Sequence, residues 1–445
     1  MKHPHSSNRR QFLKLSTGLA ALGMTGLGLG AARSAQAASP SDYKALVCVY
    51  LYGGNDGHNL IVPLDTARYT AYQNVRAGLA LGAAKLCTPI ADSGGNPYAL
   101  HYGLPEMNTL FGQGKLAVLL NTGMLERPLT RAQYLQGIYA PTNLFSHSDQ
   151  TVQVQSGQPT VVGTGWGGRL LDRFGAAQDS LAAVSVAGPS LLLQGQDVAG
   201  NVVTPGVDPG LSGMGPWPAS AAAARRQALT NILQMNGGNV LRQAANQSMT
   251  DGLHLADALK TNSGGTLSHT FPGTELGRQL EAVARLIRLR SQTPGRQVFF
   301  CGFGGFDTHS GQDWQQWDLL KQLSQALNVF YQEIGDAGLG AQVTAFTQSE
   351  FGRTLQPNGG GSDHGWGSHH LVLGGAVQGG IYGQMPSHAL NGPDDANGRG
   401  VLIPKISTSQ VGATLGRWFG ASDAELAAVF PNLSQFPNSN LGFMG

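Results

Sequence analysis

The chain has 445 residues, of which 12% are charged, and a formal net charge of +2. This length allows a sizeable hydrophobic core, and the weak charge excludes the basic footprint that nucleic-acid binding requires. The three cysteines, Cys48, Cys87 and Cys301, lack the number and spacing of a disulfide framework, which excludes a small disulfide-stabilised module.

The first 38 residues have the pattern of an export signal. Arg9-Arg10 forms a twin-arginine motif, an apolar stretch with five glycines follows at 15–32, and Ala35-Gln36-Ala37 is a small-x-small cleavage site. A transmembrane anchor is the alternative, but the stretch has too few strongly apolar residues to span a bilayer. We therefore expect a twin-arginine signal peptide at 1–38, a periplasmic or secreted protein, and no transmembrane anchor after cleavage.

The rest of the chain alternates between helical patterns and apolar runs. The helices expected at 276–287 and 319–334 carry apolar residues at a spacing of three and four. Each is followed by an apolar run typical of a strand buried on both faces. This order predicts an α/β fold in which helices sandwich a mostly parallel β-sheet. The expected strands are 45–52, 115–121, 297–301 and 342–347.

We expect a single domain over residues 39–445, with one compositional departure. The segment at about 188–275 is rich in Gly, Ala, Ser and Gln, and we interpret it as a cap or insertion with a helix at 219–234. Two short helices, at 408–420 and 421–430, are expected to pack back onto the sheet.

Five polar, glycine-flanked clusters interrupt the chain, and most of them follow an expected strand. They collect Asp, Glu, His and Ser, which are the metal ligands and the hydroxyl nucleophile of hydrolytic metalloenzymes. Because the carboxyl ends of parallel strands meet at one crevice, we expect these residues to form a single site. The clusters are 53–59, 146–149, 305–309, 347–353 and 361–365.

Two of the clusters offer carboxylates directly after strands. Asp56 is either a metal ligand or an ordinary turn residue, since Asn-Asp-Gly favours turns. Asp307 and His309 lie two residues apart, so both can bind one divalent ion, and the pair suits zinc or manganese better than calcium. The alternative is that Asp307 caps the following helix and His309 is a surface residue.

The remaining clusters add an arginine, a serine and more histidines. Arg353 suits a tetrahedral oxyanion, although a plain ion pair with Glu350 is the alternative. Asp363 and His364 open a segment with two further histidines, which can orient metal ligands instead of binding the metal. Ser146 precedes an expected helix, either as a nucleophile or as the helix N-cap.

Together these motifs are specific, although each one alone is weak. Over nearly its whole mature length the chain resembles the exported bacterial family catalogued as domain of unknown function 1501. The motifs that carry the resemblance are Tyr52–Asn59, Ser146-His147, Gly163–Asp172, Gly305–His309, Ser349–Thr354 and Ser362–Gly365.

That family is similar in organisation to the alkaline phosphatase superfamily of phosphatases, sulfatases and phosphoglycerate mutases. The resemblance implies an alkaline phosphatase-like α/β core with two divalent ions, which are zinc, manganese or magnesium. It implies that Ser146 takes the place of the nucleophile and that Asp363 with His364 can be a displaced Asp–His pair. The metal ligands that it implies are Asp56, Asp307, His309, Glu350 and His364.

We therefore expect an exported metal-dependent hydrolase or transferase of phosphate or sulfate esters with a two-metal mechanism. Ser146 or a water attacks a small anionic ester, and Arg353 steadies its oxygens. One alternative is a non-catalytic exported protein of the same fold that binds metal or another ligand, and a second is a metal-free surface or secretion component.

Overall fold

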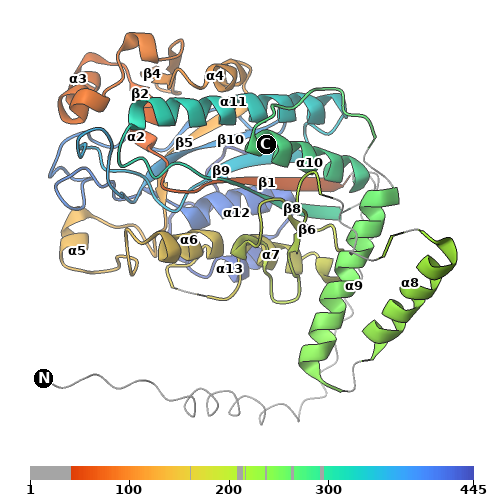
Figure 1. The fold of residues 1–445 in the computed structure, drawn as a ribbon. Helices are drawn as coiled ribbons and strands as arrows, with labels where there is room; N and C mark the ends of the chain where they lie inside the picture. The colour runs from red at the N-terminus through yellow and green to blue at the C-terminus, as the bar shows by residue number, and fades with distance from the viewer. Residues whose placement is uncertain are drawn as a thin grey trace, which may run out of the picture. The chain divides into compact units, whose positions relative to one another are not determined.

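One β-sheet organises the computed structural model, which describes residues 42–160, 162–207, 214–215, 217–235, 238–261, 265–290 and 295–445 (Figure 1). Within these residues its nine strands stand in the order β11-β5-β10-β9-β1-β8-β6-β7, with β12 beside β5. The strands are β1 (Tyr43–Leu51), β5 (Leu116–Gly123), β6 (Ala183–Ser185), β7 (Asn201–Val202), β8 (Gly295–Phe303), β9 (Val343–Gln348), β10 (Ser368–Gly374), β11 (Gly380–Tyr382) and β12 (Ile406–Ser407).

Strand direction brings several loops to one edge of this sheet. β1 is parallel to β8 and β9, whereas β10 runs antiparallel to both β9 and β5. Consequently β1, β5, β8 and β9 all end at the edge where β10 begins. Helix α11 (Gln312–Asp336) connects β8 to β9, and β1 lies between these two strands. The predicted α/β fold with a mostly parallel sheet is confirmed.

Strand β1 shows why the predicted strands are apolar at every position. Ala45, Val47 and Val49 belong to one hydrophobic cluster, whereas Leu46 and Cys48 belong to another. Successive side chains of a strand point to opposite faces of the sheet, so a strand covered on both faces needs apolar residues throughout.

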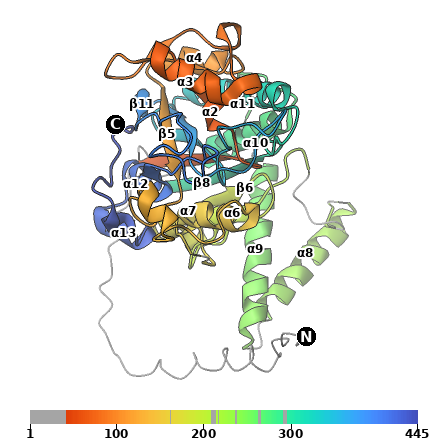
Figure 2. The same cartoon turned by 90° about the vertical axis from the view of Figure 1, so that its left-hand side faces the viewer.

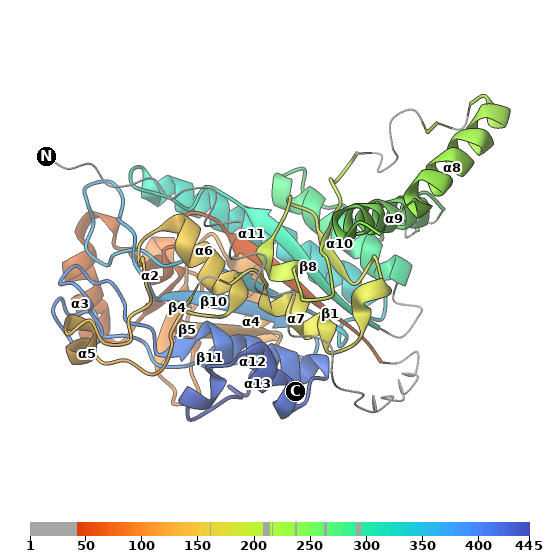
Figure 3. The ribbon, with the colours of Figure 1, turned by 90° about the horizontal axis from the view of Figure 1, so that it is seen from below.

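Helices cover both faces of the sheet. Side chains of α4, α10 and α11 pack in the first cluster, and side chains of α6, α7, α12 and α13 pack in the second. Figure 2 shows these layers on either side of the sheet, and Figure 3 views the second layer from outside. Besides α11, the α-helices named here and below are α2 (Gly57–Leu60), α3 (Thr66–Arg76), α4 (Pro105–Gly112), α5 (Arg131–Leu135), α6 (His147–Ser156), α7 (Trp166–Asp172), α8 (Ala219–Gln234), α9 (Val240–Thr261), α10 (Glu275–Arg290), α12 (Thr408–Phe419) and α13 (Asp423–Val429).

The segment at 188–275 contains β7, which pairs with β6, and the helices α8 and α9, which contact each other. The helix predicted at 219–234 is confirmed, while the role of the segment as a cap or insertion stays a prediction. A separate antiparallel sheet consists of β2 (Ile61–Pro63), β4 (Pro97–Leu100) and β3 (Ile90–Ala91).

The predicted signal peptide at 1–38 lies outside the described residues. In the part of the chain that is described, the helices are too short or too polar to cross a bilayer.

Candidate metal site

The loops at the carboxyl edge of the sheet pack closely because one of them contains Gly53. This residue follows β1 with a φ of 115°, and a Cβ on it would lie 2.2 Å from the backbone nitrogen of Asp307, which follows β8. Only glycine allows the two loops to approach this closely without strain. The first predicted cluster therefore shapes the site through its backbone.

A backbone bridge holds two side chains of the site together. Arg353 and His364 form an antiparallel bridge, and Gly365 N donates to Gly352 O beside it over 2.7 Å. From this bridge both side chains reach Asp307. Arg353 Nη1 lies 3.0 Å and His364 Nε2 lies 3.3 Å from Asp307 Oδ1.

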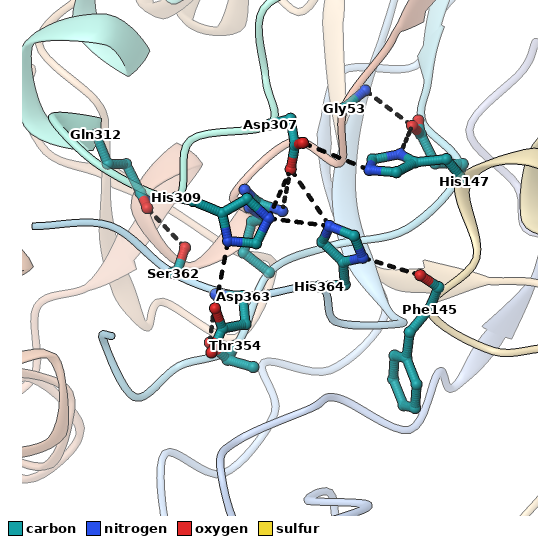
Figure 4. Close-up of polar contacts among 12 residues, drawn as sticks. Gly53, Phe145, His147, Asp307, His309, Gln312, Thr354, Ser362, Asp363 and His364 are labelled. Atoms are coloured by element: carbon teal, nitrogen blue, oxygen red, sulfur yellow. Dashed lines mark hydrogen bonds and ion pairs between the residues drawn. The ribbon is translucent and has the colours of Figure 1, made fainter. Parts of the chain in front are cut away.

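Three imidazole rings converge on the Asp307 carboxylate (Figure 4). His309 Nε2 lies 3.1 Å from Oδ1, and His147 Nε2 lies 3.6 Å from Oδ2. His364 Nε2, the third ring nitrogen, is 3.1 Å from His309 Nε2. These rings come from three separate parts of the chain, which are the start of α6, the loop after β8 and the loop before β10.

The opposite nitrogen of each ring is already engaged. Carboxylate and carbonyl oxygens only accept hydrogen bonds, so the shorter contacts of Nδ1 in His147 and His364 favour a proton on Nδ1 and a lone pair on Nε2 in the neutral rings. His309 has acceptors at similar distances from both of its nitrogens. Proteins orient metal-binding histidines in this way. The acceptors are Glu350 Oε1 for His147 at 2.8 Å, Asp363 Oδ1 for His309 at 3.3 Å, and Phe145 O for His364 at 2.8 Å.

These donor atoms fit a divalent transition-metal ion. Ligand atoms of His147, Asp307 and His364 all lie within 4.8 Å of one another. In a tetrahedral site with metal–ligand bonds of about 2.05 Å, neighbouring ligand atoms lie about 3.4 Å apart. The ring nitrogens lie 3.1 to 3.6 Å from the Asp307 oxygens, which is close to that separation. Imidazole and carboxylate together suit zinc or manganese. The residues around Asp307 are thus able to hold one ion.

Arg353 adds a buried positive charge beside these donors. Its side chain is 0% exposed, and its contact with Asp307 is an ion pair without the alignment of a hydrogen bond. Among the described residues, its Nε and Nη2 atoms have no hydrogen-bond partner. Unpaired buried donors raise the free energy of a folded protein, so an oxyanion for which the surrounding loops make room is stabilised by accepting from them.

The electrostatic environment favours the ionised form of the Asp307 carboxylate and the neutral form of the His364 ring. Burial raises the pKa of Asp307, but Arg353 and His309 outweigh it and hold the pKa below its usual value. Burial lowers the pKa of His364, against a hydrogen bond to a backbone carbonyl that raises it. Both net shifts favour the protonation states that metal binding requires.

Asp56 lies in different surroundings from Asp307. Its carboxylate accepts hydrogen bonds from Arg76 Nη2, from Gln312 Nε2 and, over 3.0 Å, from His58 N. Its side chain is 1% exposed. Within the described residues it has no contact with the other predicted ligands, so its metal-binding role stays a prediction.

The structure decides two of the alternatives left open by the sequence. The helix after β8 begins with Gly311 as its N-cap, so the alternative of Asp307 as a helix cap is wrong. Arg353 pairs with Asp307, so a plain ion pair between Arg353 and Glu350 is also wrong. Glu350 and Asp363, which were predicted as ligands, contact ring Nδ1 atoms instead of Asp307.

Ser146 occupies the N-cap of α6 and accepts from Asp149 N over 3.4 Å. Its hydroxyl also donates to Asp149 Oδ2 over 2.5 Å. The N-cap alternative therefore describes the local structure, and the nucleophile role stays a prediction.

His147 is the site residue that the sequence reasoning missed. It lies in the same polar cluster as Ser146, and this adjacency was the available signal. Its position depends on the preceding Phe145, whose φ of 73° turns the chain at the start of α6. His369 and His370, by contrast, are buried within β10.

The chain belongs to the family described as Protein of unknown function (DUF1501), whose model matches residues 43–402. This match confirms the family that the motifs predicted. Among curated protein sequences, none matches the chain.

Solved structures with a similar arrangement include three bacterial proteins. The PsFucS1 sulfatase from Pseudoalteromonas sp. is 10% identical with a TM-score of 0.35, covering 86% of this chain and 69% of that chain. The C-terminal periplasmic domain of EcEptC from Escherichia coli, in complex with Zn, is 9% identical with a TM-score of 0.37, covering 86% and 83%. The phosphonate monoester hydrolase of Agrobacterium radiobacter is 11% identical with a TM-score of 0.29, covering 85% and 74%.

Proposed function

We propose that this chain is an exported metal-dependent hydrolase or transferase that acts on phosphate or sulfate esters. The proposal is carried by one observation, which is that three ring Nε2 atoms converge on Asp307 beside the buried guanidinium of Arg353. A cationic metal and an arginine side by side suit the charge and the oxygen geometry of a tetrahedral anion. We assign one ion to this cluster, and the second ion implied by the family resemblance stays a prediction.

Each residue of the site has a distinct part in this proposal. A divalent ion held by Asp307 and the rings would supply Lewis acidity and would lower the pKa of a bound water. Arg353 donates to the non-bridging oxygens of the ester, where negative charge builds in the transition state. We assign the attack to water, because the Ser146 hydroxyl is engaged by Asp149. Water would then bond to phosphorus or sulfur as the bond to the alcohol oxygen breaks, and the proton that the water loses would end on the released alcohol.

The test combines metal analysis with ester hydrolysis. We expect purified protein to contain zinc or manganese and to cleave aryl phosphates or sulfates, and EDTA to abolish this activity. Asp307→Asn is expected to lose both metal and activity. Asp423→Asn, at a side chain that is 81% exposed in an ion pair on α13, is the matched control and should keep both. Hydrolysis that persists in metal-free protein would exclude the proposal.

A second candidate function follows if His309 joins the three residues whose ligand atoms lie within 4.8 Å of one another, which are His147, Asp307 and His364. Structural zinc sites are closed by four protein ligands, whereas catalytic sites keep one position open. If His147, His309, His364 and Asp307 all bind the ion, the chain is a non-catalytic metal-binding protein. The absorption spectrum of the Co²⁺ form separates the two, because added phosphate changes the spectrum of an open site only.

Export is tested on the N-terminal motif. Replacing Arg9 and Arg10 together by lysine keeps the charge but removes the twin-arginine pattern. We expect the mature protein to disappear from the periplasmic or secreted fraction while the precursor accumulates inside the cell. Unchanged export of this variant would contradict the proposed signal.

A further inference from the structure

Glu350 is a buried carboxylate held by uncharged donors. It follows β9, and its side chain is 2% exposed. Its Oε1 accepts from Gly53 N over 2.8 Å, and its Oε2 lies 3.2 Å from Ser349 Oγ, whose hydroxyl also contacts Leu51 O at 2.7 Å. His147 Nδ1 lies 2.8 Å from the same Oε1, and within the described residues neither a lysine nor an arginine pairs with Glu350.

This environment determines the form of the His147 ring. An ionised carboxylate can only accept, and a buried one needs hydrogen-bond donors to offset its lost hydration. His147 therefore donates from Nδ1. In the neutral ring this leaves a lone pair on Nε2, the atom that lies 3.6 Å from Asp307 Oδ2.

We propose that Glu350 is a positioning residue, which keeps the His147 proton on Nδ1 and aims Nε2 at the divalent ion without binding the ion itself. The inference rests on the proposed function, because it takes Nε2 of His147 as a metal ligand. It replaces the ligand role that the family resemblance implied for Glu350.

The other two rings are oriented by weaker acceptors. His364 donates to a neutral backbone carbonyl. His309 contacts Asp363, whose side chain is 32% exposed and also pairs with Arg399. Hydrogen bonds to ionised acceptors are stronger than those to neutral ones, and exclusion of water strengthens them further. Glu350 therefore contributes the strongest of the three orienting contacts.

The variant that tests this role is Glu350→Gln, which keeps the size of the side chain and removes its charge. We expect its affinity for Zn²⁺ and Co²⁺, measured by competition with a chromophoric chelator, to fall about 10- to 100-fold. Asp363→Asn is the matched control, because it removes an orienting charge beside His309, and it should weaken binding less. Wild-type affinity in Glu350→Gln would overturn the proposal.

The form of the His147 ring is also readable in the wild type. Nitrogen NMR of the metal-free protein at about pH 8, with the signal assigned through His147→Gln, is expected to show the proton on Nδ1. A proton on Nε2 would overturn the proposal even if Glu350→Gln does not fold. In the folded variant we expect a mixture of both forms, which a merely structural role for Glu350 would not produce.

These measurements separate the two levels of the argument. If the wild type binds neither Zn²⁺ nor Co²⁺ while His147 carries its proton on Nδ1, the proposed function fails and orientation by Glu350 stands. If the wild type binds metal and Glu350→Gln binds it equally well, the positioning role fails and the proposed function stands.

Discussion

Two aspartates follow neighbouring parallel strands, and their surroundings are opposite. Asp56, after β1, is 1% exposed in its side chain and accepts from Arg76, Gln312 and a backbone N–H. Asp307, after β8, is 47% exposed in its side chain and faces ring nitrogens that present lone pairs. The first carboxylate is saturated by donors, and the second lies beside Arg353 and beside groups that are able to bind a metal.

The difference shows that two carboxylates at the ends of neighbouring strands can have very different partners. An ionised carboxylate surrounded by N–H donors is already stabilised. Asp307 has one cationic partner, Arg353, and the ring nitrogens beside it allow it to take up a metal ion as well. We therefore expect the Asp56 region to control stability and the Asp307 region to control binding, and the following experiments test this division.

Acid should have the largest effect on stability, because it protonates three buried histidines when the chain unfolds. Burial lowers the pKa of His369 to about 3 and the pKa values of His370 and His388 to about 4. Histidines of the unfolded chain have pKa values of about 6.5, so below pH 6.5 the unfolded state binds more protons than the folded state. Stability therefore falls as the pH drops from 6.5 toward the pKa values of the folded state.

At pH 5 each of these histidines is expected to lower the free energy of unfolding by about 2 kcal/mol. Urea unfolding at pH 7.5 and pH 5, with EDTA present so that metal loss plays no part, measures the change. Equal free energies at the two pH values would show that these rings are not buried in the neutral form.

Asp56→Ala tests the same region by substitution. It leaves Arg76, whose side chain is 0% exposed, without its ionic partner. Breaking a buried pair on one side typically lowers stability by about 3 to 5 kcal/mol. His364→Ala is the control, because its Nδ1 bonds a neutral backbone carbonyl and not a buried charge, and it should lose metal while the stability of the metal-free protein changes little. A stable Asp56→Ala variant that has lost metal would show that Asp56 controls metal binding and not stability.

Arg353→Lys tests the anion-binding half of the site. Lysine keeps the charge but lacks the planar set of donors that matches a tetrahedral oxyanion. We expect ester turnover to fall about 10²- to 10³-fold, with weaker inhibition by inorganic phosphate and unchanged metal content. Arg399→Lys, on a side chain that is 40% exposed, is the control and should change turnover much less. Equal turnover in the two variants would remove Arg353 from the proposed reaction.

The fold was predictable from the sequence because its signals are local. The run at 45–52 is apolar at every position, as a strand between two helical layers requires, and the helix at 219–234 has the predicted bounds. The reversed direction of β10 was not predictable, since its apolar residues carry no sign of strand direction.

The site was predictable only in part, because its contacts join distant segments. Asp307, His309 and His364 were recognised by residue type, and the structure brings them together. The role of Asp56 depends on Arg76 and Gln312, and no local pattern connects these residues. His147 was missed because the turn at Phe145 that places its ring has no clear signature in the sequence.

Ser146→Ala has the smallest expected effect and decides which group attacks the ester. Loss of an N-cap typically lowers stability by about 1 kcal/mol. Ser422→Ala is the matched control, because Ser422 caps α13 in the same way at a distance from the Asp307 cluster. If water is the nucleophile, the two variants lose similar stability and both keep ester turnover. Loss of turnover in Ser146→Ala alone, with the metal content of the wild type, would make Ser146 the nucleophile, because an unchanged metal content shows that the neighbouring His147 is still in place.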